Sequence, residues 1–202
     1  MKINYQKILD KTINDITKEN RRPRLLLHSC CAPCSSYVLE YLSGIFDITI
    51  YYYNPNIFPE SEYISRFNEQ KRFVDDFIKE NKIDIIKEKL NSEVFYEKVK
   101  GLENEPEGGE RCLKCFDLRL KKTAEYAKEN GFDYFTTTLT ISPHKNAEAI
   151  NEIGERIAAE IGMKYLFSDF KKKEGYKRSI QLSNEYNLYR QDYCGCVYSK
   201  KL

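Results

Sequence analysis

A loop with three cysteines in five residues stands between an apolar run and a helical pattern, and it limits the folds that the chain can adopt. Residues 28–34 read HSCCAPC; the apolar run 25–27 precedes them, and Val38, Leu39 and Leu42 follow at helical spacing. A strand, a tight loop and a helix start in this order are typical of a doubly wound sheet, where the first helical turn offers unpaired N–H groups to an anion. Phosphate-binding loops carry glycines at this point. Thiolates are soft, anionic ligands that a helix N-terminus helps to keep ionised, so we interpret the loop as the floor of a metal or redox site.

The rest of the chain alternates between strand and helix patterns. The expected strands cover residues 24–28, 46–53, 83–86, 132–139 and 164–167, and the expected helices cover residues 4–19, 35–43, 59–81, 92–100, 112–130 and 142–162. This alternation predicts a mainly parallel sheet with helices on both faces, which is a three-layer α/β fold. We expect one domain over residues 1–202, with an N-terminal helix (1–22), an α/β core (23–170) and a helical, basic C-terminal cap (171–202) that folds over the site.

Seven cysteines are present among the 202 residues, and all of them fall into three tight groups. No apolar run approaches the roughly 20 residues that cross a bilayer, and residues 1–20 lack the apolar core of a signal peptide. We therefore expect a cytoplasmic protein without a membrane partner, whose ordinary thiols the cell keeps reduced. Packing of small buried cysteines would not explain the grouping. Metal binding or redox chemistry is the favoured role.

The second thiol group, Cys112 and Cys115, lies at an expected helix start. The two residues stand at i and i+3 and share a helix face, which Arg119 joins at i+7. With Cys30 and Cys31 they would supply four thiolates, the ligand set of zinc or of an iron–sulfur cluster. A vicinal pair suits one small tetrahedral ion poorly, so we favour the cluster over zinc.

Two other interpretations of the cysteines stay open. Residues 31–34 read CAPC at a strand–helix junction, which is also the pattern of a thioredoxin-like thiol–disulfide oxidoreductase. That enzyme would need no metal and would make Cys34 catalytic, but it leaves the other five cysteines without a role. The second alternative is a zinc-stabilised RNA-binding module without catalysis.

The third thiol group is Cys194-Gly195-Cys196. Two cysteines one residue apart can close a small, strained disulfide, which the backbone freedom of glycine permits. Strained bridges are reduced more readily than structural ones. We therefore favour a redox-active pair, with ligation of the same metal as the alternative.

The C-terminal part of the chain is basic and rich in rings. Residues 164–202 contain nine Lys and Arg, four Asp and Glu, and eight aromatic residues. This mixture suits the phosphates and unstacked bases of RNA, although composition alone favours a solvated face with tyrosines packed beneath it. Asn54, Ser142 and Lys145 follow expected strands and can therefore reach a ligand at the same sheet edge, although their residue types would also suit ordinary loops.

Four motifs resemble those of the QueH-type epoxyqueuosine reductases. They are residues 28–34 (HSCCAPC), 110–115 (ERCxxC), 138–145 (TLxxSPxK) and 175–196 (GYxRS through LYRQxYCGC). The resemblance covers about residues 24–198. It implies a Rossmann-like sheet similar to that of the adenine-nucleotide alpha-hydrolases (the HUP fold), with the thiol loop in the place of a pyrophosphate loop.

The resemblance also implies cofactors and a ligand set. It implies a 4Fe–4S cluster on Cys30, Cys31, Cys112 and Cys115, and a redox-active pair formed by the two cysteines of the third group. It further implies an additional mononuclear iron near the cluster. The sequence does not assign the ligands of that iron, and Cys34 is the spare thiol.

The implied reaction is the reduction of epoxyqueuosine to queuosine in a tRNA anticodon loop, without cobalamin. The electrons would come from a low-potential donor such as ferredoxin or flavodoxin. With such a substrate, Lys177, Arg178 and Arg190 are expected to contact phosphates, and Tyr189 or Tyr176 to stack on a base.

Overall fold

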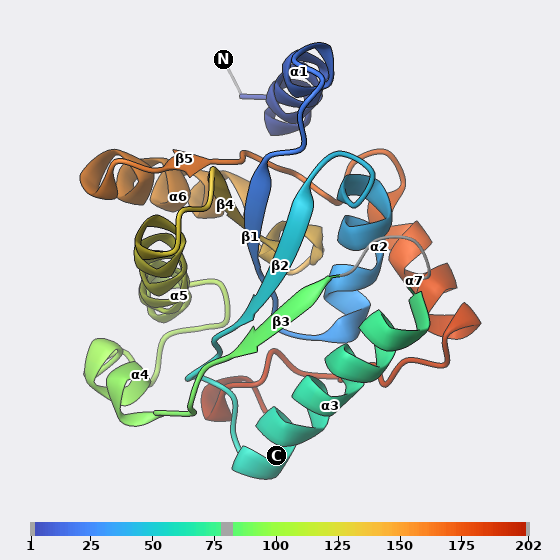
Figure 1. Ribbon diagram of the computed structural model, residues 1–202. Helices are drawn as coiled ribbons and strands as arrows, with labels where there is room; N and C mark the ends of the chain where they lie inside the picture. The colour runs from blue at the N-terminus through green and yellow to red at the C-terminus, as the bar shows by residue number, and fades with distance from the viewer. Residues whose placement is uncertain (1–2, 78–82, 201–202) are drawn as a thin grey trace.

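The computed structural model describes residues 3–77 and 83–200, and its centre is a parallel sheet (Figure 1). The strands are β1 (Arg24–His28), β2 (Asp47–Tyr52), β3 (Asp84–Lys87), β4 (Tyr134–Thr137) and β5 (Lys164–Tyr165), in the order β3-β2-β1-β4-β5. Every neighbouring pair is parallel. The chain builds outward from β1 to β3 and then returns to the other side of β1 for β4. The carboxyl ends of β1 and β4 therefore form the switch point at which open sheets of this kind bind ligands.

Helices cover both faces of this sheet. They are α1 (Tyr5–Lys18), α2 (Ala32–Leu42), α3 (Glu60–Phe77), α4 (Glu93–Lys98), α5 (Glu110–Glu129), α6 (Ala147–Ile161) and α7 (Gly175–Glu185), with short 3-10 turns η1 (Thr138–Ile141) and η2 (Val197–Ser199). Alternate residues of β1 point to opposite faces, as the pleat of a strand requires. Leu25 and Leu27 pack with α1, α2 and α3, whereas Leu26 packs with α5 and α6. Figure 1 shows the same division, with α5 and α6 on one side and α2, α3 and α7 on the other. The predicted three-layer, Rossmann-like α/β fold is confirmed.

Several boundaries differ from the sequence-based expectations. Helix α2 begins at Ala32, three residues earlier than expected, because Cys31 is extended and Pro33 suits a first turn. Helix α6 begins at Ala147, and not at residue 142, because the Asn146 side chain accepts hydrogen bonds from the next N–H groups and caps the helix there. Strand β4 ends at Thr137, where η1 takes over. The expected end of α3, residues 78–81, lies outside the described residues.

Candidate redox centre and metal site

The thiol loop lies at the carboxyl end of β1, and its three sulfurs are close together. Cys30 and Cys31 are buried, and their Sγ atoms are 3.8 Å apart. Cys34 stands in the first turn of α2, and the three Sγ atoms all lie within 4.8 Å of one another. Among the residues that the structure describes, this is the one group of metal-binding side chains that meets so tightly. Three soft donors at this spacing can hold a metal.

The three thiols of the loop differ in how readily they carry a negative charge. Hydrogen bonds from Cys31 and Cys34 hold the pKa of Cys30 well below its usual value, and Arg119 and Lys145 act in the same direction. The same interaction raises the pKa of Cys31 to about 12 and raises that of Cys34 as well. Of the three thiols, Cys30 is therefore the one that most readily carries the charge.

The second thiol group lies in the first turns of α5. Cys115 is buried, and burial raises its pKa to about 12. Cys112 is half-buried and accepts a hydrogen bond from the Gly108 N–H (3.2 Å). Cys112 packs against the apolar cluster that contains Cys30 and Cys31, so the first two thiol groups border one layer of the core.

Arg119 connects the second group to the sheet edge. Its guanidinium is buried and lies 3.9 Å from the Cys115 Sγ, one helical turn away, as the i and i+4 spacing requires. The same group donates to Asn54 Oδ1 (2.7 Å) and to His28 Nε2 (3.2 Å). Burial would lower the pKa of Arg119, but the sulfurs of Cys115, Cys30 and Cys194 outweigh it. One cation thus faces sulfurs of all three groups.

The third thiol group is held in a conformation that requires glycine. Gly195 has φ +120°, and a Cβ there would lie 3.0 Å from Ile57 Cγ1 and 3.1 Å from Arg66 Nη1. The buried Cys196 packs with Cys115 in one small cluster. The charges of Cys194 and Cys196 raise the pKa of Cys112 further, after burial. The third group therefore lies beside the second.

Lys145 is a second cation among the sulfurs. Burial alone would lower its pKa, but the sulfurs of Cys194, Cys30 and Cys34 raise it above its usual value. An ammonium and a guanidinium held among thiols favour negative charge on sulfur. This donor set fits an anionic, thiolate-bound metal group at the switch point.

The other expected substrate contacts have different surroundings. Asn54 is buried and ties the thiol loop to β2 by donating to the Ser29 carbonyl (2.8 Å). Ser142 accepts from the His144 N–H (3.4 Å). Lys177 pairs with Glu174 on the exposed side of α7.

Arg178 and Arg190 also have partners within the protein. Arg178 bridges Glu40 of α2 and Glu185 of α7, each at 2.7 Å, and Arg190 donates to Ser183 Oγ (2.9 Å). Tyr189 is 45% exposed. A phosphate at Arg178 would therefore compete with carboxylates, whereas the ring of Tyr189 is open to a base.

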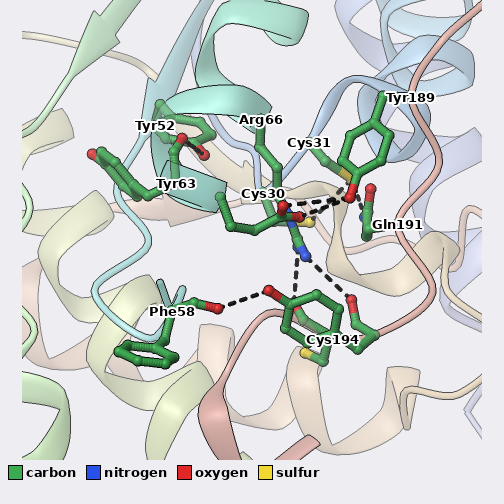
Figure 2. A network of polar contacts seen from close by, with 11 residues as sticks. Cys30, Cys31, Tyr52, Phe58, Tyr63, Arg66, Tyr189, Gln191 and Cys194 are labelled. Atoms are coloured by element: carbon green, nitrogen blue, oxygen red, sulfur yellow. Dashed lines mark hydrogen bonds and ion pairs between the residues drawn. The ribbon is translucent and has the colours of Figure 1, made fainter. Parts of the chain in front are cut away.

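Two side chains of α3 contact the segments that carry the thiols, although nothing in the cysteine motifs points to them. Arg66 and Gln70 stand on the buried side of α3 between Tyr63 and Phe73. Gln70 Oε1 accepts from Ser29 Oγ (2.8 Å) and Ser35 Oγ (2.9 Å), which flank the loop. Figure 2 shows Arg66 between the thiol loop and Cys194. The signal in the sequence is a pair of polar residues within an apolar helical stripe.

Residues 25–202 match the sequence profile of the family described as Epoxyqueuosine reductase QueH. The chain belongs to this family. A QueH protein of Staphylococcus epidermidis is 49% identical over 98% of this chain and 85% of its own length. Those of Acinetobacter baylyi and Thermotoga maritima are 45% and 36% identical, each over 87% of this chain and over 80% and 89% of their own lengths.

Membership in the QueH family confirms the expected enzyme class. The chain is an oxidoreductase of the epoxyqueuosine reductase type. Within residues 3–77 and 83–200, none of the helices combines the length and the apolar character that crossing a bilayer requires.

Proposed function

We propose that this protein reduces the epoxide of epoxyqueuosine in the anticodon loop of a tRNA and so produces queuosine. Relatives that carry the name epoxyqueuosine reductase support the substrate nucleoside. The observation that carries the proposal is that sulfurs of all three thiol groups act on Arg119, and those of the first and third groups also on Lys145, at the switch point of the sheet. The protein would work in the cytoplasm with a low-potential donor such as ferredoxin or flavodoxin.

The thiols of the first two groups suit a metal cofactor. We assign a 4Fe–4S cluster to Cys30, Cys31, Cys112 and Cys115, and such a cluster supplies single-electron transfer when it is bound. Cys34 is then free for the additional mononuclear iron. Arg119, Lys145 and the Gln191 Nε2, which donates to Cys31 Sγ (2.9 Å), favour negative charge on these sulfurs.

The third group can supply the electrons and protons that the reaction consumes. When Cys194 and Cys196 form a disulfide, two S–H bonds are lost and two electrons and two protons are released. An epoxide that becomes an alkene takes up two electrons and two protons, and its oxygen leaves as water. One dithiol therefore balances one turnover, and the external donor with two protons restores the dithiol.

Lys145 is the group that we assign to the leaving oxygen. Its ammonium faces Cys30, Cys34 and Cys194, and the raised pKa keeps it protonated at neutral pH. It can therefore donate a hydrogen bond or a proton to an oxygen beside the thiols. We do not assign this role to Tyr193, because its hydroxyl donates to the Phe58 carbonyl (2.7 Å).

The nucleic acid would approach over the C-terminal cap. Tyr189 is positioned to stack on a base, and Lys177, Arg178 and Arg190 are proposed phosphate contacts. Arg178 must then exchange at least one carboxylate partner for a phosphate.

The experiment that tests this function is turnover on defined tRNA. Anaerobically purified protein, a tRNA that carries epoxyqueuosine and a chemical reductant are mixed, and the digested nucleosides are analysed by mass spectrometry. We expect stoichiometric queuosine, bound iron and sulfide, and loss of multiple turnover in Cys194→Ser and Cys196→Ser. Full turnover by both variants would exclude the dithiol step. A colourless zinc protein that binds tRNA without converting it would instead favour the binding module.

A further inference from the structure

One face of α3 runs along the C-terminal segment that carries the third thiol group. Arg72 donates to the carbonyls of Tyr186 (3.0 Å) and Asn187 (3.3 Å), and Glu69 accepts from the Tyr189 N–H (2.7 Å). Arg66, one turn before Glu69, contacts the same segment further along. Arg66, Glu69 and Arg72 are three residues apart in sequence, which places them on one side of the helix.

Arg66 contacts the backbone of the segment that carries the third thiol group. Its side chain is 0% exposed, Nε pairs with Glu62 (2.7 Å), Nη1 donates to the Cys194 carbonyl (3.1 Å) and Nη2 donates to the Tyr193 carbonyl (3.3 Å). The guanidinium carbon also lies 5.1 Å from the centre of the Tyr193 ring. Figure 2 shows these contacts converging on one guanidinium. A planar group with five N–H donors can hold two successive carbonyls in one geometry, which a lysine cannot.

The same helix also holds the first thiol group. Gln70, one turn after Arg66, accepts hydrogen bonds from Ser29 and Ser35 on either side of the loop. The hydrogen bond with Glu62, and after it the charges of Cys31 and Cys30, keep the pKa of Arg66 above its usual value in spite of burial. Arg66 therefore stands between the two thiol segments and contacts the backbone of one while its charge acts on the other.

We propose that Arg66 is a positioning residue, which fixes the Cys194-Gly195-Cys196 segment against the thiol loop through the carbonyls of residues 193 and 194. The catalytic consequence rests on the proposed redox role of that pair, whereas the holding of the segment does not. Gly195 shows how close this fit is, because even a Cβ would meet Arg66 Nη1 at 3.1 Å.

The test compares Arg66 with a matched arginine of the same helix. Arg72 also donates to two carbonyls of the C-terminal segment, but its side chain is 42% exposed and its carbonyls lie seven residues before those of Arg66. Arg66→Met, Arg66→Lys and Arg72→Met are purified anaerobically. Alkylation of Cys196, which is 7% exposed, is followed by peptide mass spectrometry without turnover. kcat and KM are then measured on the tRNA.

We expect Cys196 in Arg66→Met to be alkylated at least tenfold faster than in the parent, and Arg72→Met to stay within twofold. We expect kcat to fall at least tenfold with KM within twofold, and added guanidinium to restore part of it. Arg66→Lys keeps the charge but holds fewer carbonyls, so its alkylation rate and kcat should lie between those of the parent and those of Arg66→Met. Equal alkylation of Cys196 in the Arg66 and Arg72 variants would overturn the proposal.

The two proposals fail in different ways. If alkylation responds to Arg66 while Cys194→Ser and Cys196→Ser keep full turnover, Arg66 positions the segment and the dithiol role is wrong. If those serine variants are inactive and Cys196 is unchanged in Arg66→Met, the dithiol role stands and Arg66 does not position the pair. Should Arg66→Met not fold, Arg66→Lys with and without guanidinium gives the same comparison.

Discussion

Arg119 Nε donates a hydrogen bond to His28 Nε2 across 3.2 Å, and both side chains are buried. Burial, and after it the charge of Arg119, lowers the pKa of His28 to about 3. Its Nδ1 lies 2.8 Å from Thr137 Oγ1, and its Nε2 also lies 3.2 Å from the Tyr53 carbonyl. A neutral histidine at the end of β1 is therefore tied to β4 across the switch point, directly beneath the thiol loop.

Replacement of Arg119 should destabilise the protein more than replacement of an exposed arginine. Arg119→Met removes the partner of Asn54 Oδ1 and the cation that faces three thiol groups, and we expect a loss of about 3 kcal/mol, the scale for breaking a buried charge network. The matched control is Arg156→Met, since Arg156 is half-exposed and pairs with Asp117 and Glu160. We expect it to change the free energy of unfolding by less than about 1 kcal/mol. Urea denaturation of both variants measures the difference, and equal losses would contradict it.

Iron content should separate the two classes of cysteine. Alanine at Cys30 or Cys112 should remove most of the bound iron and of the visible absorbance, because each residue is assigned to the cluster. In Cys194→Ser the iron content and the visible absorbance should stay within about 20% of the parent's values, since a dithiol that is oxidised and reduced does not ligate the cluster. Iron and sulfide analysis of anaerobically purified protein checks this. Loss of iron in Cys194→Ser would transfer that residue to the ligand set.

Gly195→Ala should strain the third thiol group. The residue has φ +120°, which side chains rarely adopt, and a Cβ would press on Ile57 and Arg66. We expect a loss of about 1–3 kcal/mol in the free energy of unfolding, together with faster alkylation of Cys196. Gly44→Ala is the control, because a Cβ there has nothing within 4 Å. Similar unfolding curves for the two variants would argue against the close fit.

The attachment of the C-terminal segment to α3 should weaken in acid. The hydrogen bond from Arg72, and after it that from the Tyr189 N–H, holds the pKa of Glu69 below its usual 4.5. A carboxyl whose pKa is lowered on folding stabilises the protein above its unfolded pKa, and that contribution is lost as the pH falls through the folded value. We expect Glu69→Gln to be less stable than the parent by about 1 kcal/mol at pH 7, the scale of an exposed pair. The difference should vanish below the lowered pKa, as unfolding measured from pH 7 to pH 3 would show.

Charge reversal on the cap should weaken tRNA binding. Lys177→Glu removes a proposed phosphate contact, so we expect affinity to fall about tenfold and the slope of log K against log salt to drop by about 1. Lys18→Glu on α1 is the control, because Lys18 lies at the other end of the chain and is paired with Asp15. Affinity that is the same in both variants would place the RNA surface elsewhere.

Local patterns made part of this architecture predictable. The order of strand, thiol loop and helix was visible in the sequence because the apolar residues change from continuous to helical spacing at the loop. The shared face of Cys115 and Arg119 followed from helical geometry alone. Helix starts were less certain, because Ser142 and Asn146 are both good caps and only the latter accepts the N–H hydrogen bonds of α6.

Long-range contacts made the rest unpredictable. The sequence placed Arg178 among phosphate contacts because nothing in it showed that Glu40 of α2 faces this residue, yet Arg178 bridges Glu40 and Glu185. Arg66 and Gln70 carry no motif. The role of Gln70 depends on a loop that lies at least 35 residues before it, and that of Arg66 on a segment that lies more than 120 residues after it. Such pairings are set by the whole fold.

The dual attachment of α3 has a mechanical consequence. Since neighbouring turns of one rigid helix hold the loop at Ser29 and the segment at Cys194, any tilt or sliding of that helix carries both sulfur sites with it. In the proposed reaction, the distance between the thiol loop and the Cys194 segment would therefore stay the same while the tRNA binds and leaves.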